Sequence, residues 1–207
     1  MIRLTTFVGA IALVSAGAHA SIVATGGDAV LIGAPASSAL GAMESNTVAP
    51  CWNEVSTFTL TAPLAVNATV PGMYASVGSL TPGVIPAGTV VSSHYLYSDP
   101  VGSAAGFYQG FMDFDQPVIG VIVLRPELNA SDWVGTPGTV YADNVARGME
   151  VVSNEFFFLS VSTFRVGFQF NTTSATDDIR VITLVPAPGV VGACAVAGLA
   201  VFRRRRG

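Results

Sequence analysis

The chain has no lysine, and its 207 residues include only two cysteines and two histidines. Cys51 stands alone in the central part of the chain, and Cys194 lies in an apolar C-terminal segment, so a disulfide framework is excluded. All thirteen acidic residues lie between positions 21 and 185, where only four arginines oppose them, so this body has a formal charge near −9. Such a body repels nucleic acid and anionic lipid, which makes both poor partners.

The sequence offers few residues for histidine-based catalysis. His94 is the one histidine outside the first twenty residues, and its neighbour Ser93 would point to the opposite face of a strand. No Gly-X-Ser-X-Gly elbow, metal-thiolate cluster, phosphate-binding loop or internal repeat is visible. The sequence therefore predicts a structural or partly exposed histidine rather than a nucleophilic centre, and no catalytic residue.

The first twenty residues have the three parts of a secretory signal peptide. Arg3 provides the positive start, an apolar stretch follows, and Ala18, His19 and Ala20 form a small-X-small ending. We therefore expect a signal peptide over 1–20, with cleavage after Ala20. Removal of both ends leaves about 165 residues, enough for one domain with its own core.

The last twenty-two residues form an apolar segment between a proline pair and a basic cluster. Residues 189–202 carry no charge, and a helix over 188–202 would span roughly 22 Å, less than a hydrocarbon core of about 30 Å. An apolar span before a cationic end is typical of a segment held in the membrane with that end in the cytoplasm. We expect a weak transmembrane helix over 188–202, although its length alone would also suit a buried helix. The flanking residues are Pro186, Ala187, Pro188, Arg203, Arg204, Arg205 and Arg206.

This arrangement resembles the PEP-CTERM sorting signal of Gram-negative bacteria. In that family a membrane protease called exosortase is thought to cut near a Pro-Glu-Pro motif and pass the protein to the envelope or beyond. Ala187 stands where the family usually has Glu, so the chain carries a Pro-Ala-Pro variant. The resemblance implies two partners, the general secretion machinery and an exosortase-type protease. It also implies passage across the inner membrane, a transient anchor and a final place in the envelope or outside the cell.

The body, 21–185, is dominated by short extended patterns separated by Gly, Pro and Asn. Apolar residues fall on even positions from Phe58 to Val70, which predicts a long strand or a hairpin. The sequence predicts strands over 89–97 and 118–124, and the second of these should be a central, buried strand. It predicts a polar loop over 126–140. Phe156, Phe158, Phe164 and Phe168 share one parity, which predicts a single core-facing side from 156 to 170. The fold class is all-β, an antiparallel β-sandwich resembling a jelly roll.

Carboxylates are the best candidates for metal binding. Asp113 and Asp115 would share one face of a strand, and Asp177 is followed directly by Asp178. Calcium suits such oxygen ligands, but no EF-hand or RTX repeat is present, so these four are weak candidates and no cofactor is required. A glycoside hydrolase would need two such groups about 5 to 9.5 Å apart, which the spacing does not establish.

The segment from Ser93 to Gly102, with 119–122 and 131–132, resembles a body domain that recurs among PEP-CTERM cargo proteins. That resemblance implies a shared fold and no assigned activity. We expect a non-enzymatic exported protein of the cell envelope or extracellular matrix, with extracellular polysaccharide as one candidate partner. A carbohydrate-binding module is the first alternative and would need an open groove lined by Trp133, Tyr95 or Tyr97. A secreted glycoside hydrolase is the second.

Overall fold

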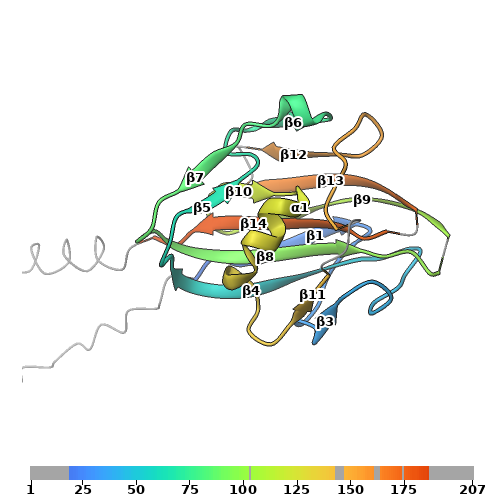
Figure 1. The fold of residues 1–207 in the computed structure, drawn as a ribbon, viewed down its shortest axis with the longest axis horizontal. Coiled ribbons are helices and arrows are strands. Elements are labelled where there is room, and N and C mark those ends of the chain that lie inside the picture. The colour runs from blue at the N-terminus through green and yellow to red at the C-terminus, as the bar shows by residue number, and fades with distance from the viewer. Residues whose placement is uncertain (1–18, 103, 143–146, 161–163, 174, 187–207) are drawn as a thin grey trace, which may run out of the picture. The chain divides into compact units, whose positions relative to one another are not determined.

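The computed structural model describes residues 19–102, 104–142, 147–160, 164–173 and 175–186 (Figure 1). They form one compact unit, His19–Pro186. Residues 1–18 of the expected signal peptide, and the tail from Ala187 with the expected helix 188–202, lie outside the described residues. Within the described part, no helix is long and apolar enough to span a membrane.

One five-stranded sheet, here named sheet A, is antiparallel throughout. Its strands are, in spatial order, β1 (Ile22–Gly27), β9 (Ala105–Phe114), β13 (Arg165–Thr173), β12 (Phe156–Ser160) and β6 (Gly72–Tyr74).

A second five-stranded sheet, named sheet B, is antiparallel except for its last pair, β4 and β2, which is parallel. Its strands are, in order, β10 (Val118–Ile122), β14 (Asp177–Leu184), β8 (Val90–Ser98), β4 (Ala49–Thr59) and β2 (Ala29–Leu31).

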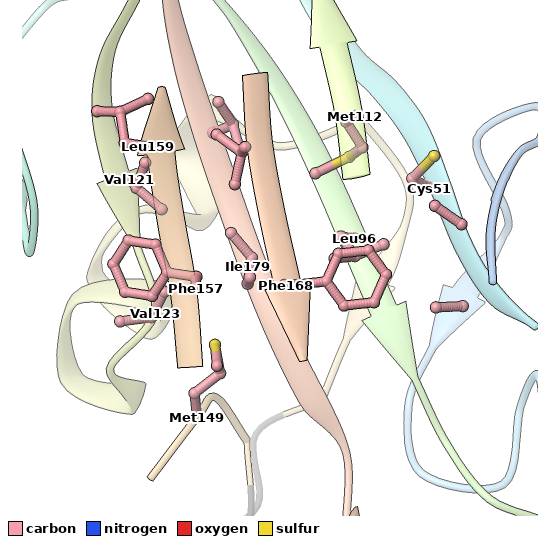
Figure 2. Packing of buried hydrophobic residues seen from close by; sticks show 14 of the residues in the cluster. Cys51, Leu96, Met112, Val121, Val123, Met149, Phe157, Leu159, Phe168 and Ile179 are labelled. Carbon is pink, nitrogen blue, oxygen red and sulfur yellow. The ribbon is translucent and has the colours of Figure 1, made fainter. Parts of the chain in front are cut away.

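The main hydrophobic core takes side chains from both sheets (Figure 2). Phe157 and Phe168 come from sheet A, while Cys51, Leu96 and Ile179 come from sheet B. Each is at most 3% exposed. Burying an aromatic or aliphatic side chain of this size stabilises the fold by about 1.5 to 3 kcal/mol, so the core holds the sheets together without disulfides.

The outer face of sheet B is covered by short elements, so this sheet is buried on both sides. A second apolar cluster, which includes Trp52, Tyr95 and Leu128, fills the space beneath them. The covering elements are β3 (Ser37–Ser38) paired with β11 (Val140–Tyr141), β5 (Leu64–Val66) paired with β7 (Gly83–Ile85), α1 (Arg125–Ala130) and η2 (Asp132–Val134). The short helix η1 (Val77–Ser79) follows β6 in the chain.

The outer face of sheet A is different, because large apolar side chains on it reach solvent. Phe107 on β9 is 53% exposed and Met73 on β6 is 64% exposed. This face is therefore the one on which apolar side chains are available for contact with another molecule.

The all-β prediction is confirmed, and two sheets that share a core give a sandwich-like arrangement, but the strand orders show no jelly roll. Several finer predictions were wrong. Residues 58–70 do not form the long strand that was one of the two alternatives, because β4 ends at Thr59 and β5 begins at Leu64. The break lies near Pro63, as expected for the other alternative, a hairpin, but β4 pairs with β8 and β5 with β7, so these two strands form no hairpin. Within 118–124, Val118–Ile122 form the edge strand β10 rather than a central strand. Val121 and Ile122 are buried nonetheless, because apolar clusters cover both faces of this strand. The expected polar loop over 126–140 contains α1 and η2.

The single core-facing side expected for 156–170 is also wrong. Two strands, β12 and β13, occupy this stretch, and each register pair joins an even-numbered residue to an odd-numbered one. Directly paired residues lie on the same face of a sheet, so the core parity reverses between the two strands. Phe168 therefore points into the core, whereas Phe156 and Phe158 lie on the outer face and Phe157 takes the buried place.

Candidate functional site

A shallow hollow of about 350 Å³ lies on the outer face of sheet A. We name it the phenylalanine hollow. Four neighbouring strands, β1, β9, β13 and β12, provide its surface, and their side chains at alternate positions face outward. Its principal lining residues are Phe111, Phe156, Phe158, Gln109, Gln169 and Gly110.

The register explains how the rings come to lie flat. Gly167 pairs with Phe111 on one side and with Phe158 on the other, and Gly26 pairs with Phe111 across β1. A Cβ atom at Gly167 would meet the Phe158 ring at 2.0 Å, and one at Gly26 would meet the Phe111 ring at 2.3 Å. Glycine at these two positions therefore lets each ring lie across its neighbouring strand.

Polar groups frame the hollow. Arg165 and Asp113 are register partners and form a two-pronged ion pair, with Nε–Oδ1 at 2.6 Å and Nη2–Oδ2 at 2.8 Å. The Arg165 guanidinium lies 3.6 Å from the centre of the Phe111 ring. Gln169 faces Gln109 in the register and donates from Nε2 to the carbonyl oxygen of Asn154 at 2.9 Å. The surface thus combines aromatic faces, amides and a self-neutralised charge pair, a combination that suits non-covalent binding.

The aromatic residues expected to line a groove are elsewhere. Tyr95 and Tyr97 are fully buried in sheet B. Trp133, 38% exposed, lies over that same sheet with its ring tilted 59° to that of Phe58 and the two ring centres 5.8 Å apart. The hollow was missed because the parity assumed for 156–170 assigned Phe156 and Phe158 to the core. The run of three phenylalanines from Phe156 to Phe158 was the signal that could have found it, because consecutive strand residues point to opposite faces and cannot all enter the core.

A second pocket, of about 270 Å³, is acidic, and we name it the acidic pocket. Glu150, Glu155 and Asp177 line it, with carboxylate oxygens all within 4.8 Å of one another. Asp177 accepts a hydrogen bond from the Thr172 hydroxyl, and Glu155 accepts one from the Glu150 backbone N–H at 2.9 Å. Glu155 and Asp177 are buried, whereas Glu150 is exposed.

Burial of these carboxyls changes their protonation. Burial, reinforced by the charges of Asp177 and Glu150, raises the pKa of Glu155 to about 9. Burial, with the charges of Glu150 and Asp178 adding to it, raises the pKa of Asp177 to about 8. The cluster can therefore share protons at neutral pH, and its oxygen ligands are also of the kind that calcium accepts.

The four predicted metal ligands do not come together. Asp113 is held by Arg165, and Asp115 accepts a 2.7 Å hydrogen bond from the backbone N–H of Ser21 through Oδ1. Asp178 lies on the outer face of sheet B, where Tyr95 donates to it at 3.0 Å. Of the two candidate pairs, only Asp177 belongs to the acidic pocket, where it lies with Glu150 and Glu155.

A buried ion network lies beneath α1, on the covered face of sheet B. Neither Arg180 nor Glu54 has an exposed side chain, and they form two hydrogen bonds, Nε–Oε2 at 2.8 Å and Nη2–Oε1 at 2.9 Å. Ser93 and Tyr141 also donate to Glu54. Arg180 donates further to Ser131 at 2.6 Å, so the pair is satisfied on all sides.

Arg147 extends this network toward the molecular surface. It donates hydrogen bonds to Asp132 at 2.7 Å and to the Tyr95 hydroxyl at 3.0 Å. Asp132 also accepts a hydrogen bond from Arg180 at 3.1 Å. Burial raises the pKa of Tyr95 well above its usual value and also raises that of Asp178. Such a closed set of mutual contacts is typical of a structural network. An arginine within the apolar strand 179–185 was its sequence signal.

His94 behaves as the structural histidine that the sequence predicts. Its Nδ1 lies 2.7 Å from Asn53 Oδ1 and its Nε2 2.9 Å from Thr183 Oγ1, on the core side of β8. Burial lowers the pKa of His94 to about 3, so the ring is neutral at pH 7. Ser93 contacts Glu54 on the opposite face, so the two side chains are kept apart.

Two of the residues predicted for sorting and processing, Ala20 and Pro186, lie at the ends of the compact unit. Ala20 is buried and Pro186 is exposed. Ala187, Pro188 and Arg203 to Arg206 lie outside the described residues.

No protein-family model, no curated protein and no solved structure matches this chain.

Proposed function

We propose that this protein is an exported, non-enzymatic component of the cell envelope or extracellular matrix, sorted through a PEP-CTERM-like tail. The observation that carries the proposal is the extent of the compact unit, His19–Pro186. It begins two residues before the expected signal-peptide cut after Ala20, and it ends at the first proline of the Pro-Ala-Pro motif. Removal of both ends would leave both sheets intact.

The first and last residues of the expected mature body are fixed by hydrogen bonds. Ser21 donates its backbone N–H to Asp115 Oδ1 at 2.7 Å, and Asp115 returns a backbone bond to Ser21 at 3.2 Å. Cleavage after Ala20 would give Ser21 a charged α-amino group beside that carboxylate, which favours the ion pair. At the other end, the backbone N–H of Val185 donates to Val90 at 3.0 Å, and Pro186 is exposed to a protease.

The tail supplies the sorting step. The apolar helix expected over 188–202 would hold the chain in the inner membrane while four arginines resist translocation. An exosortase-type protease would then cut near Pro186, and the released body would remain in the envelope or leave the cell. The general secretion machinery would act first, at the signal peptide.

A binding or structural role is better supported than catalysis. In the acidic pocket, Asp177 and Glu155 are buried and only Glu150 is exposed, so a substrate would not meet a pair of accessible carboxylates. The glycoside hydrolase alternative needs two such groups around one bond. The phenylalanine hollow, in contrast, is open and carries no reactive pair.

The test replaces Arg203, Arg204, Arg205 and Arg206 together with serine in the native host. Loss of the basic cluster should let the tail pass through the membrane, so the protein should be unprocessed or misplaced. The matched control replaces the same four residues with lysine, which keeps the charge and should preserve processing. Fractionation and intact mass report the result. Normal processing of the serine variant would refute the sorting role of the tail.

A further inference from the structure

We propose that the phenylalanine hollow binds a neutral polysaccharide, whose sugar rings stack on Phe156 and Phe158, beside the Phe111 ring that Arg165 covers. The proposal rests on export of the protein, because such a polymer would be met outside the inner membrane. Sugars have apolar ring faces and hydroxyl edges, and the hollow offers flat aromatic faces beside amide groups. Its volume of about 350 Å³ and its shallow shape suit part of an extended chain rather than an enclosed small molecule.

The strand register sets the distances between the backbone positions that carry the rings. Phe111 on β9 and Phe158 on β12 flank the same glycine of β13, so they stand two strand spacings apart, roughly 9.6 Å. Phe156 and Phe158 are two residues apart on β12, roughly 6.8 Å. A polymer crossing the strands would thus meet the Phe158 ring, with Phe156 beside it, and then the Arg165 guanidinium that is stacked on Phe111.

Amides provide the polar half of the recognition. Gln109 and Gln169 are register partners at the centre of the hollow, and each amide has both donors and an acceptor. The bond from Gln169 to the Asn154 carbonyl holds one of these groups in place. Ligand hydroxyls can both donate and accept, so they match amides without requiring a charge.

The charge of this face argues against an anionic ligand. Of the four arginines in the described part of the chain, only Arg165 lies on sheet A, and Asp113 neutralises it. Asp28, at the edge of the hollow, adds a negative charge and accepts the Gln109 backbone N–H at 2.9 Å. An anionic lipid headgroup or an acidic polymer would find no unpaired cation here, and the body charge near −9 would repel it.

A second copy of the chain is a poorer occupant. Two copies would bring together two bodies that each carry a formal charge near −9, and this repulsion opposes their association.

The experiment is affinity electrophoresis of the protein purified from its host through gels that contain a neutral polysaccharide. The probes are hydroxyethyl cellulose, a soluble β-1,3-glucan, dextran, and the neutral fraction of the host's own extracellular polysaccharide. Phe158→Ala removes one ring, and Trp133→Ala is the control because it removes an exposed aromatic over the other sheet. Gln109→Ala tests the same hollow by another contact should Phe158→Ala fail to fold.

We expect at least one probe to retard the wild-type protein, with binding about tenfold weaker for Phe158→Ala and unchanged for Trp133→Ala. Absence of retardation by all four probes, or equal retardation of all variants, would overturn the proposal. Self-association in sedimentation that Phe158→Ala abolishes, without glucan binding, would assign the face to a second copy instead. Intact mass of the same sample reports processing separately. An unprocessed chain that binds glucan refutes only the export proposal, and a processed chain that binds none refutes only this one.

Discussion

Replacement of Arg180 by methionine should be among the most damaging single changes in the body. The side chains of Arg180 and Glu54 are both fully buried, and two hydrogen bonds of 2.8 and 2.9 Å join them. Without the guanidinium, the Glu54 carboxylate remains buried with only Ser93 and Tyr141 as hydrogen-bond donors. Removing one partner of a buried ion pair costs about 3 to 5 kcal/mol. A domain of this size should then lose roughly 6 to 20 °C in Tm.

Urea unfolding, followed by tryptophan fluorescence, measures this loss, since Trp52 lies 5.0 Å from Tyr95 beside the network. The control, Arg165→Met, removes an arginine whose ion pair with Asp113 is partly exposed and should cost about 1 kcal/mol or less. Combining Arg180→Met with Glu54→Leu removes both charges and should recover at least half of the lost stability. Equal costs for the two arginine variants, or no recovery in the double variant, would refute this account of the network.

Three further predictions follow from burial. In the folded protein the pKa of Glu155 is about 9 and that of Asp177 about 8, whereas both are near 4 in the unfolded chain. Because the folded state binds more protons over this range, the free energy of unfolding should fall as pH rises from about 4 to 9. Combining Glu155→Gln with Asp177→Asn should make the urea midpoint less dependent on pH. A wild-type urea midpoint that does not fall over this range would contradict the prediction. If calcium restored the midpoint at pH 9, the pocket would instead be a cation site. The pKa of His94 is lowered to about 3 in the folded protein, against about 6.5 in the unfolded chain. The neutral ring therefore contributes to stability above pH 6.5, and this contribution is lost as pH falls toward 3. The variant His94→Gln should not show this loss of stability in acid. Phe157→Ala should cost about 3 to 5 kcal/mol and Phe158→Ala under about 1 kcal/mol; similar urea midpoints would show the face assignment to be wrong.

Local patterns predicted the β class well because side-chain alternation along a strand depends only on neighbouring residues. The strand expected over 89–97 is β8, displaced by one residue, and even-numbered Leu60, Leu64 and Val66 are buried as their spacing indicates. What alternation cannot supply is the place where one strand ends and the next begins. The parity reversal between β12 and β13 depends on the length of their connection, and one residue more or fewer exchanges the two faces.

The candidate sites depended still more on contacts between distant segments. Glu54 and Arg180 are 126 residues apart, and no local pattern links them. The acidic pocket brings Asp177 to two glutamates of another segment, so the adjacent acid Asp178, on the opposite face of β14, was the wrong partner to expect. The phenylalanine hollow required the register of four strands, which only the folded sheet defines.

The most direct test of the export proposal is the intact mass of the wild-type protein recovered from its final location in the native host. The proposal predicts a chain that begins at Ser21 and ends near Pro186, with the tail from Ala187 removed. A mass that includes residues up to Gly207 would contradict tail processing and leave a tail-anchored protein.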